Sequence, residues 1–176
     1  MRKGNYQQAA DSVNIIRRSA NEVVQALSDL VWLVSPTKDS LSASFDKLTQ
    51  YGAEMCWVRG IRFDSRLMQA RVYIGMDQRR HLYLFVKEAL NNAVKYSGAN
   101  TICLESAMEA GDRLRISVTD DGIGFNRAEA VGGNGLANLE MRAQALRGCC
   151  RLETAPGQGT RVELELPVMR KESPDG

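Results

Sequence analysis

Glu88, Asn91, Asn92 and Lys95 lie close together in KEALNNAVKYSG, residues 87–98, a stretch that otherwise reads as a buried helix. At about 100° per residue, Glu88, Asn92 and Lys95 project within about 60° of one another, beside an apolar stripe. An amide oxygen suits Mg²⁺, an ammonium suits phosphate, and a carboxylate can orient or deprotonate a hydroxyl or water. An amphipathic helix with i,i+4 pairs at its boundary explains the same residues, so this helix alone does not decide.

A second carboxylate is aimed at a core. Leu114, Ile116 and Val118 alternate along a predicted strand, and Asp120 shares their face because strand side chains repeat every two residues. A carboxylate buried without a donor costs several kcal/mol, so the protein or a ligand must supply one. An adenine amino group is such a donor.

Glycine-rich loops follow the strand that carries Asp120. Gly122 and Gly124, in DDGIGF, permit a tight turn and close approach to a ligand, and GGNGL at residues 132–136 opens a helix whose free N–H groups favour phosphate. Residues 126–134 between the loops have the length of a mobile flap. After GQG, Thr160 shares its face with Val162 and Leu164, so Thr160 and Asp120 can face the same helices.

Composition excludes several classes of protein. The 176 residues carry 23 Lys and Arg against 21 Asp and Glu, so charge indicates no nucleic-acid or membrane surface. The longest strongly apolar stretch, residues 30–34, is far short of the ~20 residues of a membrane span, and no signal-peptide core is present. Cys56, Cys103, Cys149 and Cys150 form no CxxC pair, and neither a dinucleotide fingerprint nor GxxxxGK[ST] occurs.

The elements that must position these residues follow from periodicity. Val13, Ile16, Ala20, Val23, Leu27, Leu30 and Val34 are spaced by threes and fours over three heptads. This pattern favours a bundle or coiled-coil helix ending before Pro36, although a helix lying on its own domain remains open. Further helices are predicted from residue 39 or 40 to about 59 with Gly60 as C-cap, from an Asp77 cap to 96–98, and over 135–147. Strands are predicted over 61–67, 102–108, 114–118, 150–154 and 162–166.

These motifs together closely resemble the ATP-binding domain of bacterial sensor histidine kinases, in the ATPase superfamily that includes gyrase, the ninety-kilodalton heat-shock chaperones and mismatch-repair proteins. EALNNAVKYSG is similar to the N box, DDGIGF to the G1 box, GNGLANLEMRA to the G2 box, and GQGT to the closing glycine-threonine element. The four motifs occur in the right order over residues 77–167. The N-terminal helix resembles, more loosely, the second helix of the kinases' dimerisation and phosphotransfer bundle.

The resemblance implies a fold and a domain organisation. The fold is α/β: a two-layer α/β sandwich of the Bergerat type, with a mixed sheet covered by helices on one face. The expected boundaries are 1–36 for the partial bundle helix, 39–168 for the ATP-binding catalytic domain and 169–176 for a flexible tail.

The resemblance also implies roles for individual residues. Glu88 would be the catalytic or polarising carboxylate, Asn92 would coordinate Mg²⁺, and Lys95 would approach a phosphate. Asp120 would bind the adenine amino group, with Thr160 supporting that site. The remaining ATP-binding residues implied are Tyr96, Gly122, Gly124, Gly133, Gly135 and Leu136.

The single histidine departs from the kinase pattern. His81 lies at the start of the N-box helix, about 10 Å from Glu88 along the axis, and its neighbours do not resemble an acceptor motif. We therefore expect the phosphoacceptor upstream of this segment and no self-phosphorylation.

The expected function is transfer of the ATP γ-phosphoryl group to a histidine outside this segment, for relay to a response regulator. Mg²⁺ and ATP are the expected cofactors, and a homodimer through the N-terminal bundle is expected. The expected location is cytoplasmic, free or as the cytoplasmic part of a membrane-bound sensor, with no nucleic-acid partner. An anti-sigma-type serine kinase and a non-catalytic ATP-binding module of the same fold stay as alternatives.

Overall fold

The computed structural model describes residues 20, 24, 27, 41–68, 72–127 and 134–170. The chain divides into two compact units, residues 1–37 and 38–176. Of the first unit, only Ala20, Val24 and Leu27 are described, and all three are helical. The rest of the predicted bundle helix, including its predicted end before Pro36, lies outside the described residues, so the predicted domain boundary stays a prediction.

In the second unit, the predicted helix before Gly60 is observed as α2, Leu41–Arg59. Gly60 has a φ of +68°, and the N–H of Ile61 donates to the carbonyl of Cys56 over 3.0 Å. This is the hydrogen bonding of a Schellman C-cap, as the glycine predicts. The residues predicted to cap its N-terminus, 39 and 40, are outside the described part.

The N-box helix is α3, Met76–Tyr96. Asp77 was predicted to cap it, and this prediction is wrong: the N-cap is Gly75, whose N–H donates to the Gln78 side chain over 3.2 Å. Asp77 instead lies in the first turn, where its charge complements the helix dipole. At the other end, the Ala93 carbonyl accepts both the backbone N–H of Ser97 over 3.2 Å and its hydroxyl over 2.6 Å, so Ser97 closes the last turn.

A mixed five-stranded sheet backs the helices, as predicted. Its order is β1-β3-β4-β6-β5, and β1 and β3 are parallel while the other neighbours are antiparallel. The bounds are β1 Arg62–Arg66, β3 Thr101–Glu109, β4 Arg113–Asp120, β5 Cys149–Thr154 and β6 Thr160–Pro167. The parallel pair arises because α3 crosses between β1 and β3.

A small two-stranded sheet pairs β2 (Val72–Tyr73), which precedes α3, with β7 (Met169–Arg170), which follows β6. It differs from the expectation of a flexible tail from residue 169. Met169 pairs with Tyr73 and Arg170 pairs with Val72 in an antiparallel ladder, so backbone hydrogen bonding orders these two residues. Residues 171–176 are outside the described part.

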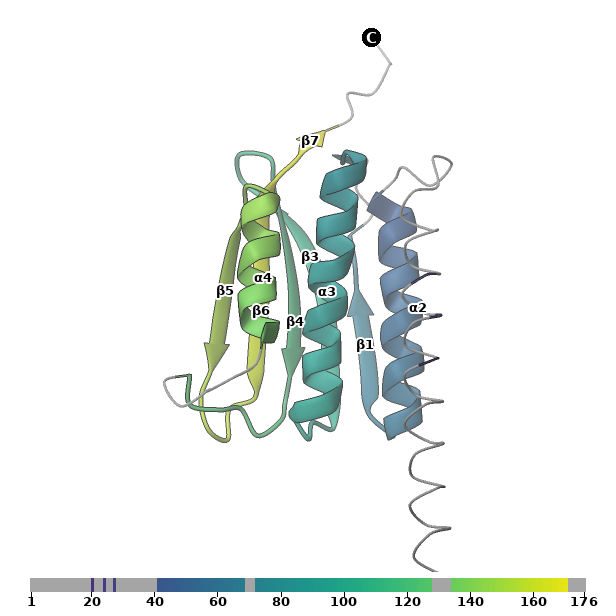
Figure 1. Cartoon of the computed structure of the whole chain (residues 1–176), viewed down its shortest axis with the longest axis vertical. Helices are drawn as coiled ribbons and strands as arrows, with labels where there is room; N and C mark the ends of the chain where they lie inside the picture. Colours follow the sequence, from purple (N-terminus) through teal and green to yellow (C-terminus); the bar gives the residue numbers. More distant parts are fainter. Residues whose placement is uncertain are drawn as a thin grey trace, which may run out of the picture. The chain divides into compact units, whose positions relative to one another are not determined.

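The helices α2, α3 and α4 (Asn134–Ala145) lie on one side of the five-stranded sheet, which confirms the predicted sandwich (Figure 1). The core between the layers consists of large side chains that are almost fully buried, among them Leu82, Phe85, Leu90, Ile102, Leu104, Leu114, Ile116 and Leu164. The strand residues of this core alternate with polar residues on the opposite face.

That opposite face carries a network of ion pairs across β3, β4, β6 and β5. Arg115 contacts Glu109 and Glu163, and Arg151 contacts Glu163 over 3.6 Å. Arg113 pairs with Glu165 in the same network. Because its charges are paired with one another, this face suits solvent, and the chemistry suggested by the sequence lies on the helix side of the sheet.

Candidate functional site

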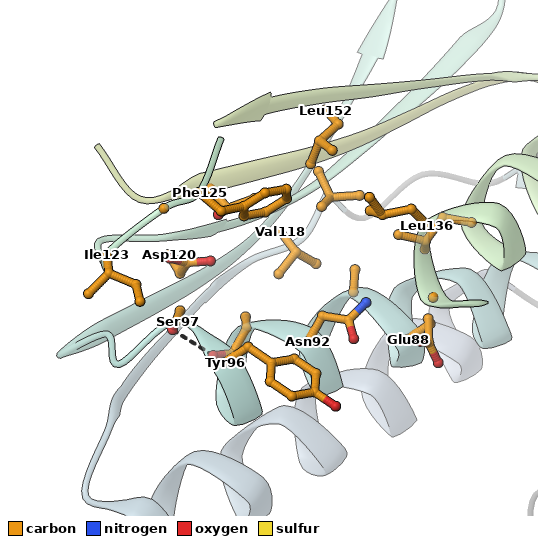
Figure 2. Close-up of a pocket in the computed structure, with 17 residues that line it drawn as sticks. Glu88, Asn92, Tyr96, Ser97, Val118, Asp120, Ile123, Phe125, Leu136 and Leu152 are labelled. Atoms are coloured by element: carbon orange, nitrogen blue, oxygen red, sulfur yellow. Dashed lines mark hydrogen bonds between the residues drawn. The ribbon is translucent and has the colours of Figure 1, made fainter. Parts of the chain in front are cut away.

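A cavity of about 480 Å³ lies between the sheet and helices α3 and α4. Figure 2 shows its lining residues, with Asp120 and Phe125 toward one end and Glu88 and Leu136 toward the other. Its walls include Val118, Leu136, Leu139, Leu152 and Val162, which give it a mainly apolar interior. Few polar groups enter it, as in sites that bury most of a small ligand.

Asp120 is the buried acceptor of this cavity. It is the last residue of β4, it faces Thr160 of β6 in register, and only 6% of it is exposed. Burial raises the pKa of the Asp120 carboxyl, while backbone N–H groups of Gly122 and Thr160 oppose that rise. The inward direction predicted from strand parity is confirmed.

Thr160 lines the cavity beside Asp120 and is held by a neighbour that the sequence analysis did not single out. The hydroxyl of Thr154 lies 3.2 Å from that of Thr160 and accepts a hydrogen bond from the N–H of Phe125 over 3.1 Å. Thr154 therefore ties the loop after Asp120 to the turn between β5 and β6. Register would have found it, since Thr154 pairs directly with Thr160.

The two glycines of DDGIGF have different surroundings. Gly124 lines the cavity with a φ of +56°, and an added Cβ would lie 2.0 Å from the carbonyl oxygen of Ala155. Gly122 is not among the lining residues: an added Cβ there would lie 2.2 Å from the carbonyl oxygen of Ser97. Gly122 thus lets the loop pack on the end of α3, behind the cavity.

The second residue of DDGIGF was also missed. Asp121 accepts hydrogen bonds from the backbone N–H groups of Thr101 and Asn100, both over 2.8 Å. These bonds, led by that from Thr101, lower the pKa of the Asp121 carboxyl. The signal was in the sequence, because a residue next to an inward-pointing strand residue must point the other way.

Glu88 and Asn92 line the opposite end of the cavity, next to the start of α4. An added Cβ on Gly135 would lie 3.0 Å from Oε1 of Glu88 and 3.2 Å from Nδ2 of Asn92. Both side chains therefore reach the same point, where α4 presents its first backbone N–H groups. Leu136 also lines the cavity, whereas Gly133 lies outside the described residues.

Three further polar residues of KEALNNAVKYSG point to different surroundings in the structure. Tyr96 lines the cavity at its rim and is 71% exposed. Lys95 is exposed and is not among the lining residues. Asn91 turns toward α2, where it accepts a hydrogen bond from the Tyr51 hydroxyl over 2.6 Å, so this amide joins two helices.

The donor set allows a weakly held metal ion. Among the described residues, no group of three or more His, Cys, Asp or Glu side chains is arranged to hold a metal. Mg²⁺ needs no such group, because it keeps waters and is commonly held by one or two side chains plus substrate phosphates. The side-chain oxygens of Glu88 and Asn92, 3.0 and 3.6 Å from the Cβ position of Gly135, fit an ion held mainly by a bound phosphate ligand.

An apolar slot with a buried carboxylate at one end and a carboxylate, an amide and a helix N-terminus at the other suits a purine nucleotide. The base would donate to Asp120, and the phosphates would lie near Gly135, where helix N–H groups favour anions. Fold and cavity together define a nucleotide-binding α/β sandwich.

The comparison with protein families agrees with this class. Residues 77–170 match the family described as histidine kinase-, DNA gyrase B-, and HSP90-like ATPase. The match covers more than half of the chain, so the chain belongs to this ATPase family, as the motifs predicted.

Similar curated proteins are sensor histidine kinases. Sensor histidine kinase ComP of Bacillus subtilis is 27% identical over 168 residues, covering 92% of this chain and 20% of that protein. Sensor histidine kinase LiaS of the same organism is 29% identical over 161 residues, covering 91% of this chain and 44% of that protein. The chain thus spans less than half the length of either relative.

Solved structures share the fold. The histidine kinase domain of the blue-light activated histidine kinase from Erythrobacter litoralis EL346 matches with a TM-score of 0.66 and 19% identity, over 90% of this chain and 85% of that one. Full-length ShkA in complex with AMPPNP matches with a TM-score of 0.69 and 18% identity, over 94% of this chain and 40% of that one.

No helix in the described part of the chain combines the length and hydropathy that crossing a bilayer requires.

Proposed function

We propose that this chain is the ATP-binding catalytic part of a two-component sensor histidine kinase. It would transfer the ATP γ-phosphoryl group to a histidine outside this segment, for relay to a response regulator. The observation that carries the proposal is the convergence of Asp120 and Thr160 with Glu88, Asn92 and Gly135 on one cavity. Membership of the ATPase family and the kinase relatives support it.

In this proposal Asp120 selects the base. A buried carboxylate accepts a hydrogen bond from the exocyclic amino group of adenine, whereas guanine presents a carbonyl oxygen at that position. Two acceptors facing each other in an apolar cavity leave both without a donor, which costs about 1–3 kcal/mol or more. Thr160, Gly124 and Tyr96 complete the base site, and Gly122 supports it from behind.

The other end of the cavity holds the phosphates. The first N–H groups of α4 beside Gly135 and Leu136 favour their charge. Asn92 would hold Mg²⁺ through its side-chain oxygen, and the ion would supply positive charge to the triphosphate. Gly133 belongs to the same loop in this proposal. Lys95 is exposed and does not line the cavity, so in this proposal it reaches a phosphate through its long side chain.

Glu88 acts where the chain meets the acceptor. In the transfer, an imidazole nitrogen attacks the γ-phosphorus, the bond to the β-phosphate oxygen breaks, and ADP leaves. A carboxylate at the phosphate end can orient the imidazole by accepting its ring N–H and can take that proton as the nitrogen–phosphorus bond forms. Catalysis then rests mainly on positioning and charge neutralisation.

The acceptor is not His81 in this proposal. His81 lies in the second turn of α3, and burial lowers the pKa of its imidazole, as do the charges of Arg142 and Arg80. With its Nδ1 atom buried, it lies about 10 Å along α3 from Glu88. We therefore place the acceptor histidine in a longer protein that contains this chain. That longer protein would also form the dimer through an N-terminal bundle and pass the phosphoryl group to the response regulator.

A titration tests the base site directly. We expect the chain to bind ATP in the presence of Mg²⁺ at least tenfold more tightly than GTP, and Asp120→Asn to lose most of that preference. Calorimetry on both proteins with both nucleotides measures it. Equal affinity of the wild-type chain for ATP and GTP, or no binding of either, would reject the proposed base site.

A second experiment tests phosphoryl transfer. In a longer chain that carries the acceptor histidine, radiolabelled ATP should give acid-labile phosphate, and Glu88→Gln should lower the rate about a hundredfold. The 176-residue chain alone should bind ATP and stay unlabelled. Acid-stable label on a partner protein would instead indicate a serine kinase, and stable label on His81 would contradict the role given to it.

A further inference from the structure

Arg142 lies on the face of α4 that packs into the interior. Gly135, Leu139 and Arg142 lie within about 60° of one another around the axis of α4, and Leu146, in the turn directly after the helix, continues this face. Leu139 and Leu146 are 2% and 0% exposed, so this face packs into the interior. Arg142 lies on it two turns, or about 10 Å, after Gly135.

The direction of the two helices brings Arg142 toward the phosphate end of the cavity. Figure 1 shows α3 and α4 side by side and antiparallel. Long side chains on a helix lean toward its own N-terminus, so Arg142 leans toward Gly135, while Glu88 leans toward the start of α3. Since Gly135 lies against Glu88, these two leanings should bring the side chains of Arg142 and Glu88 toward each other across the helix pair.

Electrostatics in the structure agree with this placement. Burial lowers the pKa of the Arg142 guanidinium, the charge of Glu88 opposes that effect, and Arg80 adds to it. The Nε atom of Arg142 is buried and has no hydrogen-bond partner within the described residues. Arg142 is half-buried, and a cation moved partly out of water is unfavourable unless a nearby anion offsets the cost; the charge of Glu88 offsets part of it here.

We propose that Arg142 is a positioning residue for Glu88: across the packed faces of α3 and α4, its guanidinium orients the carboxylate that the proposed reaction uses. The inference rests on the proposed function of Glu88. It assigns Arg142 no contact with ATP, which distinguishes it from the cavity residues. It also accounts for an arginine with a buried Nε atom on a helix face that otherwise carries leucines.

A double-mutant cycle tests whether Arg142 acts through Glu88. In the longer chain that carries the acceptor histidine, we expect Arg142→Gln to slow single-turnover phosphoryl transfer about tenfold, with the dissociation constant for ATP changed by less than about twofold. Arg142→Lys, which keeps the charge, should restore most of the rate. In a Glu88→Gln background, Arg142→Gln should have less than a twofold further effect.

Arg80→Gln is the matched control. It removes an exposed arginine that acts on Arg142 and His81 but not on the cavity, and it should leave transfer within about twofold of wild type. The inference would be overturned if Arg142→Gln slowed transfer as much in the Glu88→Gln background as in wild type. It would also be overturned if the slower transfer matched a loss of ATP affinity. An unchanged rate would overturn it as well.

A measurement on the 176-residue chain separates this inference from the proposed function. The ¹³C resonance of the Glu88 side-chain carboxyl should move in Arg142→Gln and stay in place in Arg80→Gln. If ATP binds but no transfer occurs in any background, the proposed reaction fails while this signal still reports whether Arg142 acts on Glu88. A Glu88 resonance insensitive to Arg142→Gln would reject the positioning role.

Discussion

The buried carboxyl of Asp120 suits a ligand but lowers the stability of the fold without one. Burial raises the pKa of its carboxyl above the ordinary value of 3.8, so the folded state disfavours the charged form that a ligand's amino group would need. A carboxyl whose pKa is raised on folding stabilises the protein fully only below the unfolded pKa. That contribution is lost as the pH rises through the folded pKa, so at neutral pH the buried carboxyl lowers the free energy of unfolding.

Asp120→Asn should therefore increase the free energy of unfolding at pH 7 while it weakens ATP binding. The gain should vanish near pH 3, where the carboxyl is protonated in both the folded and the unfolded state. Urea unfolding of both proteins at pH 3, 5 and 7 measures it. A variant less stable than wild type at pH 7 would show that the hydrogen bond from Gly122 to Asp120, 3.0 Å long, outweighs the burial.

His81 gives the opposite dependence on pH. Its pKa is lowered from 6.5 by burial first, then by Arg142 on α4 and by Arg80 on its own helix, with Asp77 opposing. The unfolded chain therefore binds a proton more readily, and stability falls as the pH drops from 6.5 through the folded pKa.

His81→Gln should match wild type at pH 7.5 and lose less stability than wild type between pH 7 and pH 5. Thermal unfolding at several pH values checks this, with the difference between the two proteins as the measured quantity. Equal acid sensitivity of both proteins would place the acid-sensitive group elsewhere.

At the scale of elements, the sequence predicted what local chemistry determines. Alternation located the strands, Gly60 ended α2, and strand parity turned Asp120 inward. It could not predict the N-cap at Gly75, because a glycine cap has no side chain to recognise. The β2–β7 pair was missed for another reason: two residues are too few to show alternation, and the pairing joins segments nearly a hundred residues apart in the chain.

The candidate site was also predictable only where its residues form a local pattern. Glu88 and Asn92 lie one turn apart in a single helix, so their spacing is visible in the sequence. The apolar wall contributed by Leu139, Leu152 and Val162 comes from three elements whose convergence no local pattern encodes. The sequence could not single out Arg142 for the same reason, because its inferred role depends on how α4 packs on α3.

The loop after β4 provides a prediction at this scale. Gly124 and Gly157 both have positive φ, but an added Cβ on Gly124 meets the Ala155 carbonyl at 2.0 Å, whereas on Gly157 it meets nothing within 4 Å. Gly157→Ala should cost about 1 kcal/mol, the cost of the left-handed conformation alone. Gly124→Ala should cost at least about 2 kcal/mol and weaken ATP binding, because the loop must shift. Chemical unfolding and calorimetry measure both, and equal costs would show that the loop absorbs the clash.

At the scale of the whole molecule, the two compact units should separate in function. Every described residue that lines the cavity belongs to the unit of residues 38–176, and the heptad pattern lies in residues 13–34. A chain of residues 38–176 should therefore fold and bind ATP within about twofold of the full 176 residues, because no proposed contact is removed. If the heptads pair, sedimentation should show a concentration-dependent dimer for the full chain and a monomer for residues 38–176. A monomer in both cases would reject dimerisation through this helix, and a large loss of ATP affinity on removing residues 1–37 would show that the first unit supports the site.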